Sequence, residues 1–291
     1  MTRTPVSGPR GVLGRSPPQP ISPDTHGDAR DDARDDARDD ARAQAGPHYA
    51  RLGPVAALAP YLAHFWSVRW DLAGQPPYVA ETLPHPSVHL LFEPRRAEAA
   101  GVMTGKFSRT LRGRGWVFGI KFRPAAFQPL FGAPLSRLTN RVVPLRALFG
   151  GAAAATLARQ LCAEPTVEGR AQLAEAFLLP RLPPLPPAVV LLRDLVERMA
   201  ADPTLVRVED VAALAGVGVR ALERSFRAYV GVTPKWVIGR YRLHEAAAQL
   251  AAARAPNLAE LAQRLGYFDQ AHFIRDFKAV VGRSPGRYAK E

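Results

Sequence analysis

The stretch Leu261–Tyr288, LAQRLGYFDQAHFIRDFKAVVGRSPGRY, decides the fold of the C-terminal third, because it repeats a pattern found earlier in the chain. In the first copy, Val211-Ala212 leads to Gly216 and then to Leu222-x3-Phe226-x4-Gly231-x2-Pro234. In the second copy, Leu261-Ala262 leads to Gly266 and then to Phe273-x3-Phe277-x4-Gly282-x2-Pro285. The offset is 50 residues up to the glycine and 51 after it, which places one added residue in the turn. Each copy predicts a helix, a glycine turn and a second helix, and two such helix-turn-helix units can enter successive major grooves of DNA.

Composition indicates a basic protein with room for about two domains and buried cores. The 291 residues carry a formal net charge of +13, and 47% of them are hydrophobic. Residues 47–187 hold 16 Lys and Arg against 7 Asp and Glu, a net +9, while residues 188–291 hold 16 against 11, a net +5. Such a surplus favours polyanionic partners such as nucleic acid. The excess in the middle of the chain fits either non-specific DNA affinity or attraction of an acidic ligand.

The single cysteine, Cys162, excludes an intramolecular disulfide and a multi-cysteine zinc site. No apolar run approaches the length of a membrane span, and the N-terminus lacks a signal-peptide pattern. We therefore expect a cytoplasmic protein with no membrane partner, no metal and no cofactor. The abundance of Arg, Ala and Pro indicates a GC-rich bacterial genome.

The chain divides into four predicted segments. Residues 1–46 are rich in Pro and Gly and contain the run DARDDARDDARDDAR from Asp28 to Arg42, which has no apolar face. That run predicts a disordered tail in preference to a charged helix. Residues 47–180 form a predicted sensor domain, 181–187 a stiff Pro-rich linker, and 188–291 the domain with two helix-turn-helix units.

The predicted sensor domain is strand-rich, with a helical C-terminal part. Apolar residues at helical spacing predict a helix over Pro54–Phe65. Short segments rich in Val, Phe, Trp and Ile predict strands over Phe65–Trp70, Val79–Leu83, Val88–Phe92, Val102–Thr104 and Trp116–Phe122. A hairpin turn is expected at Gly113-Arg114-Gly115. Further helices are expected after Pro124 and over Ala152–Cys162 and Val167–Leu179, and the last two either pack within the chain, which is favoured, or form a dimer interface.

The first unit predicts a recognition helix over Val219–Tyr229. Leu222 and Phe226 lie four residues apart and are expected to face the preceding helix, whose apolar side is Val208, Val211, Ala212 and Ala215. The exposed side then carries Arg220, Glu223 and Arg224, which are the predicted base-contacting residues. Arginine can bind guanine O6 and N7 with two hydrogen bonds, and glutamate can accept from cytosine N4.

The second unit predicts a recognition helix over Asp269–Val280, with Asp269 as N-cap and Phe273 and Phe277 buried. The preceding helix has the apolar residues Leu258, Leu261, Ala262 and Leu265. The predicted base-contacting residues are Gln270, Ala271, His272 and Arg275, because glutamine pairs with adenine and arginine with guanine. A continuous helix from Pro234 to about Ala253 is expected to fix the separation of the two units.

Thr233-Pro234 and Ser284-Pro285 each place a hydroxyl N-cap before a proline that opens a helix. The free N–H groups there can hold a phosphate, although a role as helix starts alone also accounts for these residues. The residues predicted to contact phosphate are Arg227, Thr233, Lys235, Lys278, Arg283 and Ser284.

At this level of detail, residues from about Val190 to Tyr288 resemble the C-terminal domain of AraC/XylS-type transcriptional regulators. The resemblance implies an all-α domain of seven helices and places the family's base-contacting positions on the residues named above. Together with the strand-rich middle domain, this predicts an α+β chain of two domains. Gly218 departs from the serine usual at the start of the first recognition helix, so that cap is expected to be weaker. The middle domain resembles more weakly an N-terminal domain fused to such regulators. This second resemblance rests on Thr82-Leu83-Pro84, Val88–Phe92, Gly119–Pro124 and Val143-Pro144-Leu145, and it implies effector sensing.

The sequence therefore predicts a non-enzymatic, sequence-specific regulator with no catalytic residue. Its predicted partners are double-stranded DNA, a small-molecule effector that the sequence does not identify, and RNA polymerase if it activates; both a monomer and a dimer are open. The repeated pattern could instead reflect only the packing of an all-α domain with no role in DNA binding, and the outward-facing arginines count against this alternative. A DNA-alkylation repair protein using Cys162 as methyl acceptor is the enzymatic alternative, although a buried structural cysteine is the commoner case. His85 and His89 would share one face of a strand, but two isolated histidines are more often ordinary polar residues than metal ligands.

Overall fold

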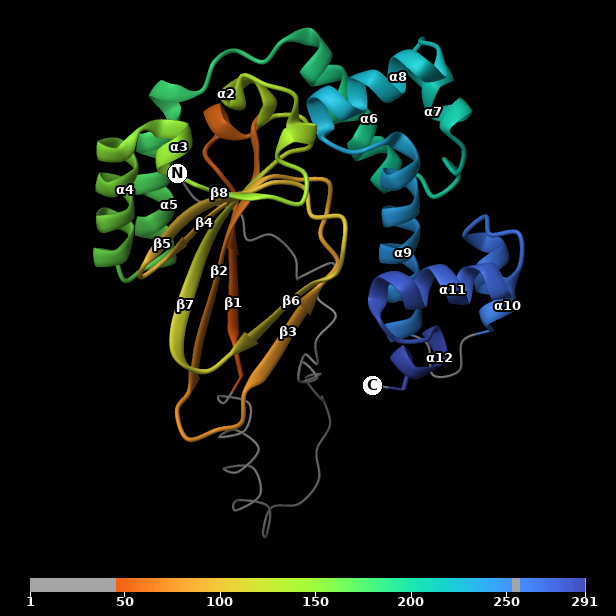
Figure 1. Ribbon diagram of the computed structural model, residues 1–291, viewed down its shortest axis with the longest axis horizontal. Coiled ribbons are helices and arrows are strands. Elements are labelled where there is room, and N and C mark those ends of the chain that lie inside the picture. Colours follow the sequence, from red (N-terminus) through yellow and green to blue (C-terminus); the bar gives the residue numbers. More distant parts are fainter. Residues whose placement is uncertain (1–45, 253–256, 291) are drawn as a thin grey trace, which may run out of the picture.

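The computed structural model describes residues 46–252 and 257–290, in which a strand-rich part is followed by a helical part (Figure 1). We call residues 46–182 the N-terminal part and residues 187–290 the C-terminal part. The predicted tail at 1–46 lies outside the described residues except for its last residue. No described helix combines the length and apolar character needed to cross a membrane.

The N-terminal part contains a six-stranded antiparallel sheet and a separate two-stranded one. In spatial order the strands of the larger sheet are β1 (His48–Leu52), β2 (Leu62–Leu72), β7 (Gly113–Phe122), β4 (His89–Glu93), β5 (Arg96–Ala100) and β8 (Val142–Pro144). The smaller sheet pairs β3 (Tyr78–Thr82) with β6 (Phe107–Leu111). Four predicted strands are thereby confirmed, in β2, β3, β4 and β7.

Alternation along β2 and β7 gives the larger sheet two different faces. Phe65, Phe118 and Ile120 point to one face and form a core with helices α4 (Gly151–Ala163) and α5 (Val167–Leu178), which matches the predicted helix pair packed within the chain. On the other face, the apolar side chains of β2 and β7 pack against β3 and β6. Two glycines of β7 make room for indole rings there: a Cβ at Gly119 would lie 2.1 Å from Trp66, and one at Gly115 2.3 Å from Trp70.

Three predictions for the N-terminal part are wrong. The helix expected over Pro54–Phe65 is only a 3-10 turn, η2 (Ala56–Leu58), followed by β2 from Leu62. Pro60 cannot donate a backbone hydrogen bond within a helix, and the residues after it are buried on both faces of a strand, which mimics helical spacing.

The other two errors concern the sheet. Val102–Thr104 is not a strand, because Val102 leaves the sheet and packs into a core of the C-terminal part. Gly113-Arg114-Gly115 is not a turn but the start of β7, paired with Leu72, Asp71 and Trp70 of β2. The strands β1, β5, β6 and β8 were not predicted; the sequence of β5, RAEAA, has no β-branched or aromatic residue.

The remaining regular elements are helical. Short elements α2 (Gln128–Phe131), η3 (Leu135–Arg137), α3 (Arg146–Phe149) and η4 (Leu179–Arg181) complete the N-terminal part. The described residues of the C-terminal part form the seven α-helices expected, α6 (Pro187–Ala201), α7 (Val208–Leu214), α8 (Val219–Ser225), α9 (Pro234–Ala252), α10 (Leu258–Arg264), α11 (Gln270–Val281) and α12 (Pro285–Tyr288). A π-helical turn, η5 (Phe226–Val230), continues α8. One hydrophobic core lies in each half of the C-terminal part, and the long helix α9 contributes to both.

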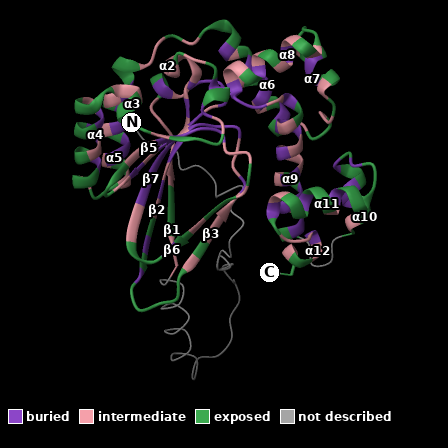
Figure 2. Ribbon diagram, in the orientation of Figure 1, coloured by how far each residue is buried: buried purple, intermediate pink, exposed green. Residues whose placement is uncertain are grey.

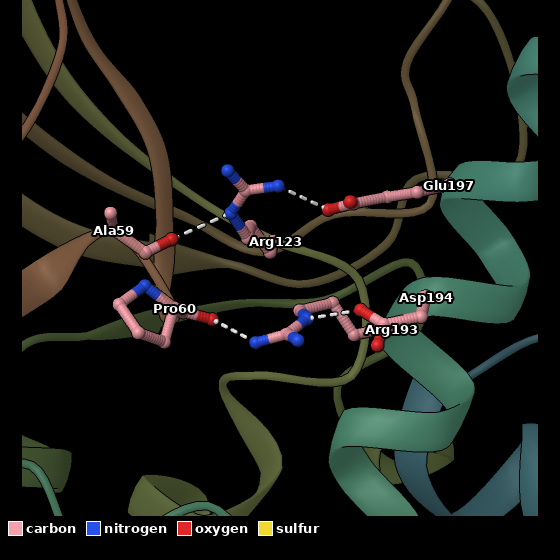
Figure 3. Close-up of polar contacts among 6 residues, drawn as sticks. All are labelled: Ala59, Pro60, Arg123, Arg193, Asp194 and Glu197. Atoms are coloured by element: carbon pink, nitrogen blue, oxygen red, sulfur yellow. Dashed lines mark hydrogen bonds and ion pairs between the residues drawn. The ribbon is translucent and has the colours of Figure 1, made fainter.

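The two parts are joined by more than the proline-rich segment. Arg123 bridges the carboxylate of Glu197 on α6 at 2.5 Å and the carbonyl of Ala59 at 2.7 Å, and Arg193 on α6 donates to the carbonyl of Pro60 at 3.2 Å (Figure 3). The proline-rich segment is itself anchored, since the Tyr61 hydroxyl donates to the carbonyl of Pro183 at 2.8 Å. This segment therefore follows the surface of the N-terminal part.

Apolar side chains also cross between the parts. Leu83, in the loop after β3, belongs to the core around α10 and α11, while Val102 and Ala125 belong to the core around α7 and α8. Both helix-turn-helix cores are thus completed by residues from the N-terminal part.

Candidate nucleic-acid interface

Each repeated unit forms two helices joined by a left-handed glycine. Gly216, between α7 and α8, has φ 64°, and Gly266, between α10 and α11, has φ 71°, a region in which a side chain is strained. Recognition helix α8 begins three residues after Gly216, and α11 begins four residues after Gly266. The added residue of the second copy therefore lies in the turn, as the sequence predicted.

The first recognition helix buries the predicted pair and exposes its arginines. Leu222 and Phe226 are 1% and 0% exposed. Arg220 and Arg224 are exposed on the opposite side of α8, and Glu223 is half-buried. Gly218 caps this helix without a side-chain hydrogen bond, as its departure from serine implied.

The second recognition helix follows the same plan with a stronger cap. Phe273 and Phe277 are fully buried, and the Asp269 carboxylate accepts from the backbone N–H of His272 at 2.6 Å. All four predicted base-contacting residues, Gln270, Ala271, His272 and Arg275, are exposed. Figure 2 shows both buried and exposed stretches on α8 and α11.

Arg224 and Arg275 occupy equivalent positions in the two units. Each lies five residues after the first residue of its recognition helix, and each is exposed. The imidazole of His272 is less free than these guanidinium groups, because it lies 3.5 Å from the Asp276 carboxylate and against the edge of the Tyr267 ring.

The residues predicted to contact phosphate differ in their accessibility. Arg227, Lys235 and Lys278 are exposed. The Thr233 hydroxyl accepts from the backbone N–H of Trp236 at 3.2 Å, which confirms it as a helix cap. Ser284 is the N-cap residue of α12, as predicted, but its side chain makes no cap hydrogen bond.

Arg283 is already engaged within the protein. Its guanidinium lies 3.7 Å from the Glu81 carboxylate of β3 and over the Tyr288 ring, and its side chain is 22% exposed. Glu81 also binds Lys106 of the N-terminal part at 2.5 Å. A sequence pattern confined to the repeat gives no sign of this ion pair, because Glu81 lies about 200 residues away along the chain.

One residue beside the second recognition helix has no predicted role. Phe268, immediately before the Asp269 cap, is 95% exposed, whereas its neighbour Tyr267 is 8% exposed and packs on Phe273. In the sequence, the position of Phe268 between Tyr267 and the predicted N-cap Asp269 was the signal that could have identified it. An exposed apolar ring at the start of a recognition helix can contact a thymine methyl group or the sugar-phosphate backbone.

The residues behind the other site hypotheses lie elsewhere. Cys162 is exposed, so the expectation of a buried structural cysteine is wrong; it lies on α4, which packs on the sheet at the opposite side of the molecule from α8 and α11 (Figure 1). His85 stacks on His244 with ring centroids 4.2 Å apart, whereas His89 accepts a hydrogen bond from Trp66. Within residues 46–252 and 257–290 no group of three or more metal-ligating side chains is present.

Comparison with known proteins finds matches to two separate stretches of the chain. Residues 211–291 match a family described as a helix-turn-helix domain, and residues 50–144 match a domain of unknown function (DUF6597). The transcriptional activator NphR of Rhodococcus sp. is 36% identical over 91 residues, which is 31% of this chain and 26% of NphR. A putative AraC-like transcription regulator of Streptomyces antibioticus is 36% identical over 83 residues, 28% of this chain and 27% of that protein.

The chain thus aligns with about a quarter of the length of these curated relatives. Among solved structures, ToxT of Vibrio cholerae covers 84% of this chain and 97% of its own, at 11% identity and a TM-score of 0.39. A likeness at that level supports no inference about ligands or fold.

Proposed function

We propose that this chain, whose C-terminal region carries a helix-turn-helix domain of the AraC type, is a sequence-specific DNA-binding transcription regulator controlled by its N-terminal part. In this proposal α8 and α11 enter successive major grooves on one face of a DNA duplex in the bacterial cytoplasm. The protein acts by binding and not by catalysis.

The observation that carries the proposal is the equivalent exposure of Arg224 and Arg275 on two recognition helices joined by one rigid helix. The 19 residues of α9 span about 28 Å, which is comparable with the ~34 Å turn of B-DNA. Each arginine can bind a guanine with two hydrogen bonds, and the exposed Arg227, Lys235 and Lys278 supply phosphate contacts. Two recognition helices in one chain allow a monomer to bind a bipartite site, and a dimer would extend it.

Control by the N-terminal part is supported by the contacts that join it to both units. Leu83 completes the core of the second unit and Val102 that of the first. A molecule that changes the packing of the N-terminal part therefore acts on both recognition helices. Whether the outcome is activation, through RNA polymerase, or repression depends on the promoter.

Selection of binding sites from random DNA with the full chain, at a fixed salt concentration, tests this proposal. We expect a motif with two blocks about one helical turn apart. Arg224→Ala should weaken base preference in one block only, and Arg275→Ala in the other. Cys162→Ser is the matched control, since α4 lies away from both recognition helices, and it should return the wild-type motif.

Two results would count against the proposal. Loss of affinity that is equal on selected and random DNA for both arginine variants would make them phosphate contacts without a role in sequence recognition. Methyl transfer from alkylated DNA to the Cys162 thiol, with stoichiometric modification of that residue, would establish the repair activity instead.

A further inference from the structure

Three basic residues form a row across one end of the larger sheet. His64 of β2 pairs with Lys121 of β7, and Lys121 pairs on its other side with His89 of β4. Residues directly opposite one another on neighbouring strands project from the same face. This is the face that carries Trp66, opposite to the face covered by α4 and α5.

Helix α9 brings two further basic residues to this end of the sheet. Arg240 is only 3% exposed; its Nη2 donates to the carbonyl of Thr104 at 2.5 Å, and its Nη1 is buried without a hydrogen-bond partner. His244 stacks on His85, and its Nε2 is likewise buried and unpartnered. The charge of Lys121 disfavours protonation of His244 as well as of His64 and His89, so all three histidines lie within electrostatic range of this lysine.

We call these five residues, His64, His89, Lys121, Arg240 and His244, the basic cluster. Burial lowers the pKa of Lys121 to about 7, and burial followed by repulsion from nearby cations lowers the pKa of His64 and of His244 to about 3. Removing charged groups from water without a partner of opposite sign is costly, which is what these lowered pKa values express.

Two carboxylates in this region, Glu197 and Glu81, are committed to other residues. Glu197, whose charge acts on the neighbouring Tyr241, is bound by Arg123 at 2.5 Å, and Glu81 is bound by Lys106. Among the described residues, no ion pair joins a carboxylate to a member of the basic cluster. The cluster therefore has donors and charge to offer to an anion from outside the chain.

We infer that the basic cluster binds the carboxylate group of a small organic molecule. Trp66 Nε1 donates to His89 Nδ1 at 3.2 Å, which leaves the proton of a neutral His89 on Nε2 as a donor. Arg240 supplies a charged donor, Lys121 supplies an amine whose protonated form a bound anion would favour, and the neutral imidazoles of His64 and His244 each carry one N–H. The rings of Trp66, His85 and Tyr241 border the cluster and suit a flat or apolar body more than a bare inorganic ion.

The position of the cluster gives such a ligand a regulatory consequence, which rests on the proposed function. Three members belong to the N-terminal part, and two belong to α9, the helix between the two units. A ligand that binds both sides stabilises this arrangement of the two parts relative to any other. The carboxylate is thereby the natural candidate for the effector.

Thermal unfolding of the full chain tests the site without requiring DNA. The probes are sodium acetate and sodium benzoate, with benzamide as the neutral counterpart of benzoate and sodium phosphate as an inorganic anion, all at one ionic strength set with sodium chloride. Above its dissociation constant, each tenfold increase in benzoate is expected to raise the unfolding midpoint by about 3–6 °C. Benzamide should have no such effect, and phosphate a smaller one.

Variants locate the effect. Lys121→Met should raise the midpoint in chloride, because it removes a buried charge, and should abolish the response to benzoate. His244→Gln should reduce that response from the α9 side. Lys290→Met, at an exposed lysine of the C-terminus, is the matched control and should respond as the wild type does.

Three outcomes would overturn the inference: neither acetate nor benzoate raises the wild-type midpoint above that in chloride, benzamide matches benzoate, or Lys121→Met keeps the full response. A phosphate effect as large as that of benzoate would refute an organic ligand. Because the readout is unfolding, a benzoate response in a chain that selects no DNA motif would refute the proposed function and leave the site intact.

Discussion

Replacing Leu83 by alanine tests whether the N-terminal part completes the core of the second helix-turn-helix unit. Leu83 is 1% exposed and packs in the same core as Phe273 and Phe277 of α11. Removing a fully buried leucine side chain and leaving a cavity costs about 3–5 kcal/mol. At about 2–4 °C per kcal/mol for a protein of this size class, the unfolding midpoint should fall by about 6–20 °C.

The location of the damage matters more than its size. Leu90 belongs to the core of the larger sheet and is 0% exposed, so Leu90→Ala should cost a similar amount. Hydrogen exchange should separate the two variants: Leu83→Ala should speed exchange of the α11 amides, and Leu90→Ala that of the strands beside β4. Leu191→Ala, at a leucine 48% exposed, is the control and should stay within about 0.5 kcal/mol of wild type. Unchanged α11 exchange in Leu83→Ala would refute the reasoning.

Three further outcomes are expected. Arg224→Ala and Arg275→Ala should each cost about 1–3 kcal/mol of binding on the selected DNA and less on random DNA, measured by titration at several salt concentrations, and the affinity of the wild type should fall steeply with salt. Phe268→Ala should weaken DNA binding while leaving the unfolding midpoint unchanged, because the ring is 95% exposed; a midpoint that falls with affinity would contradict this. The folded-state pKa of His64 and of His244 is lowered to about 3, so the unfolded chain binds more protons between about pH 3 and 6.5 and stability should rise with pH, by up to about 1.4 kcal/mol per unit for each histidine. Denaturant unfolding between about pH 5 and 6.5 measures how the free energy of unfolding changes with pH. His64→Gln should lower this slope by the equivalent of about one bound proton. A free energy of unfolding that does not change with pH would contradict the prediction.

The recognition helices were predictable almost residue by residue because their signal is local. A left-handed glycine and two buried side chains four residues apart fix where α8 and α11 begin and which side of each faces out. The same kind of reasoning predicted β2, β3, β4 and β7 correctly. It wrongly predicted a helix over Pro54–Phe65, because apolar residues buried on both faces of a strand can show the spacing of a helix. Short strands such as β5 are stabilised by pairing with neighbouring strands, and their own composition does not predict them.

The contacts between the two parts were beyond reach of the sequence because they join residues far apart along the chain. No periodicity reveals that Leu83 belongs to the core of α11 or that Glu81 holds Arg283. The basic cluster is of the same kind: His64, His89 and Lys121 become neighbours only through the register of three strands. The net +9 of residues 47–187 and the isolated His89 were sequence traces of it, but charge counts do not show which cations are buried.

The N-terminal part contacts the two units at equivalent points, just after each recognition helix. The Thr139 hydroxyl donates to the carbonyl of Gly231 at 2.6 Å, and the amine of Lys106 lies 3.1 Å from where a Cβ of Gly282 would be. These glycines are related by the repeat, and the next residue after Gly282 is Arg283, which Glu81 holds. A phosphate contact by Arg283 therefore requires its guanidinium to leave Glu81. DNA and the N-terminal part would thus compete for the same side chain. Movement of the β3–β6 pair relative to α12 would change that competition at the second unit.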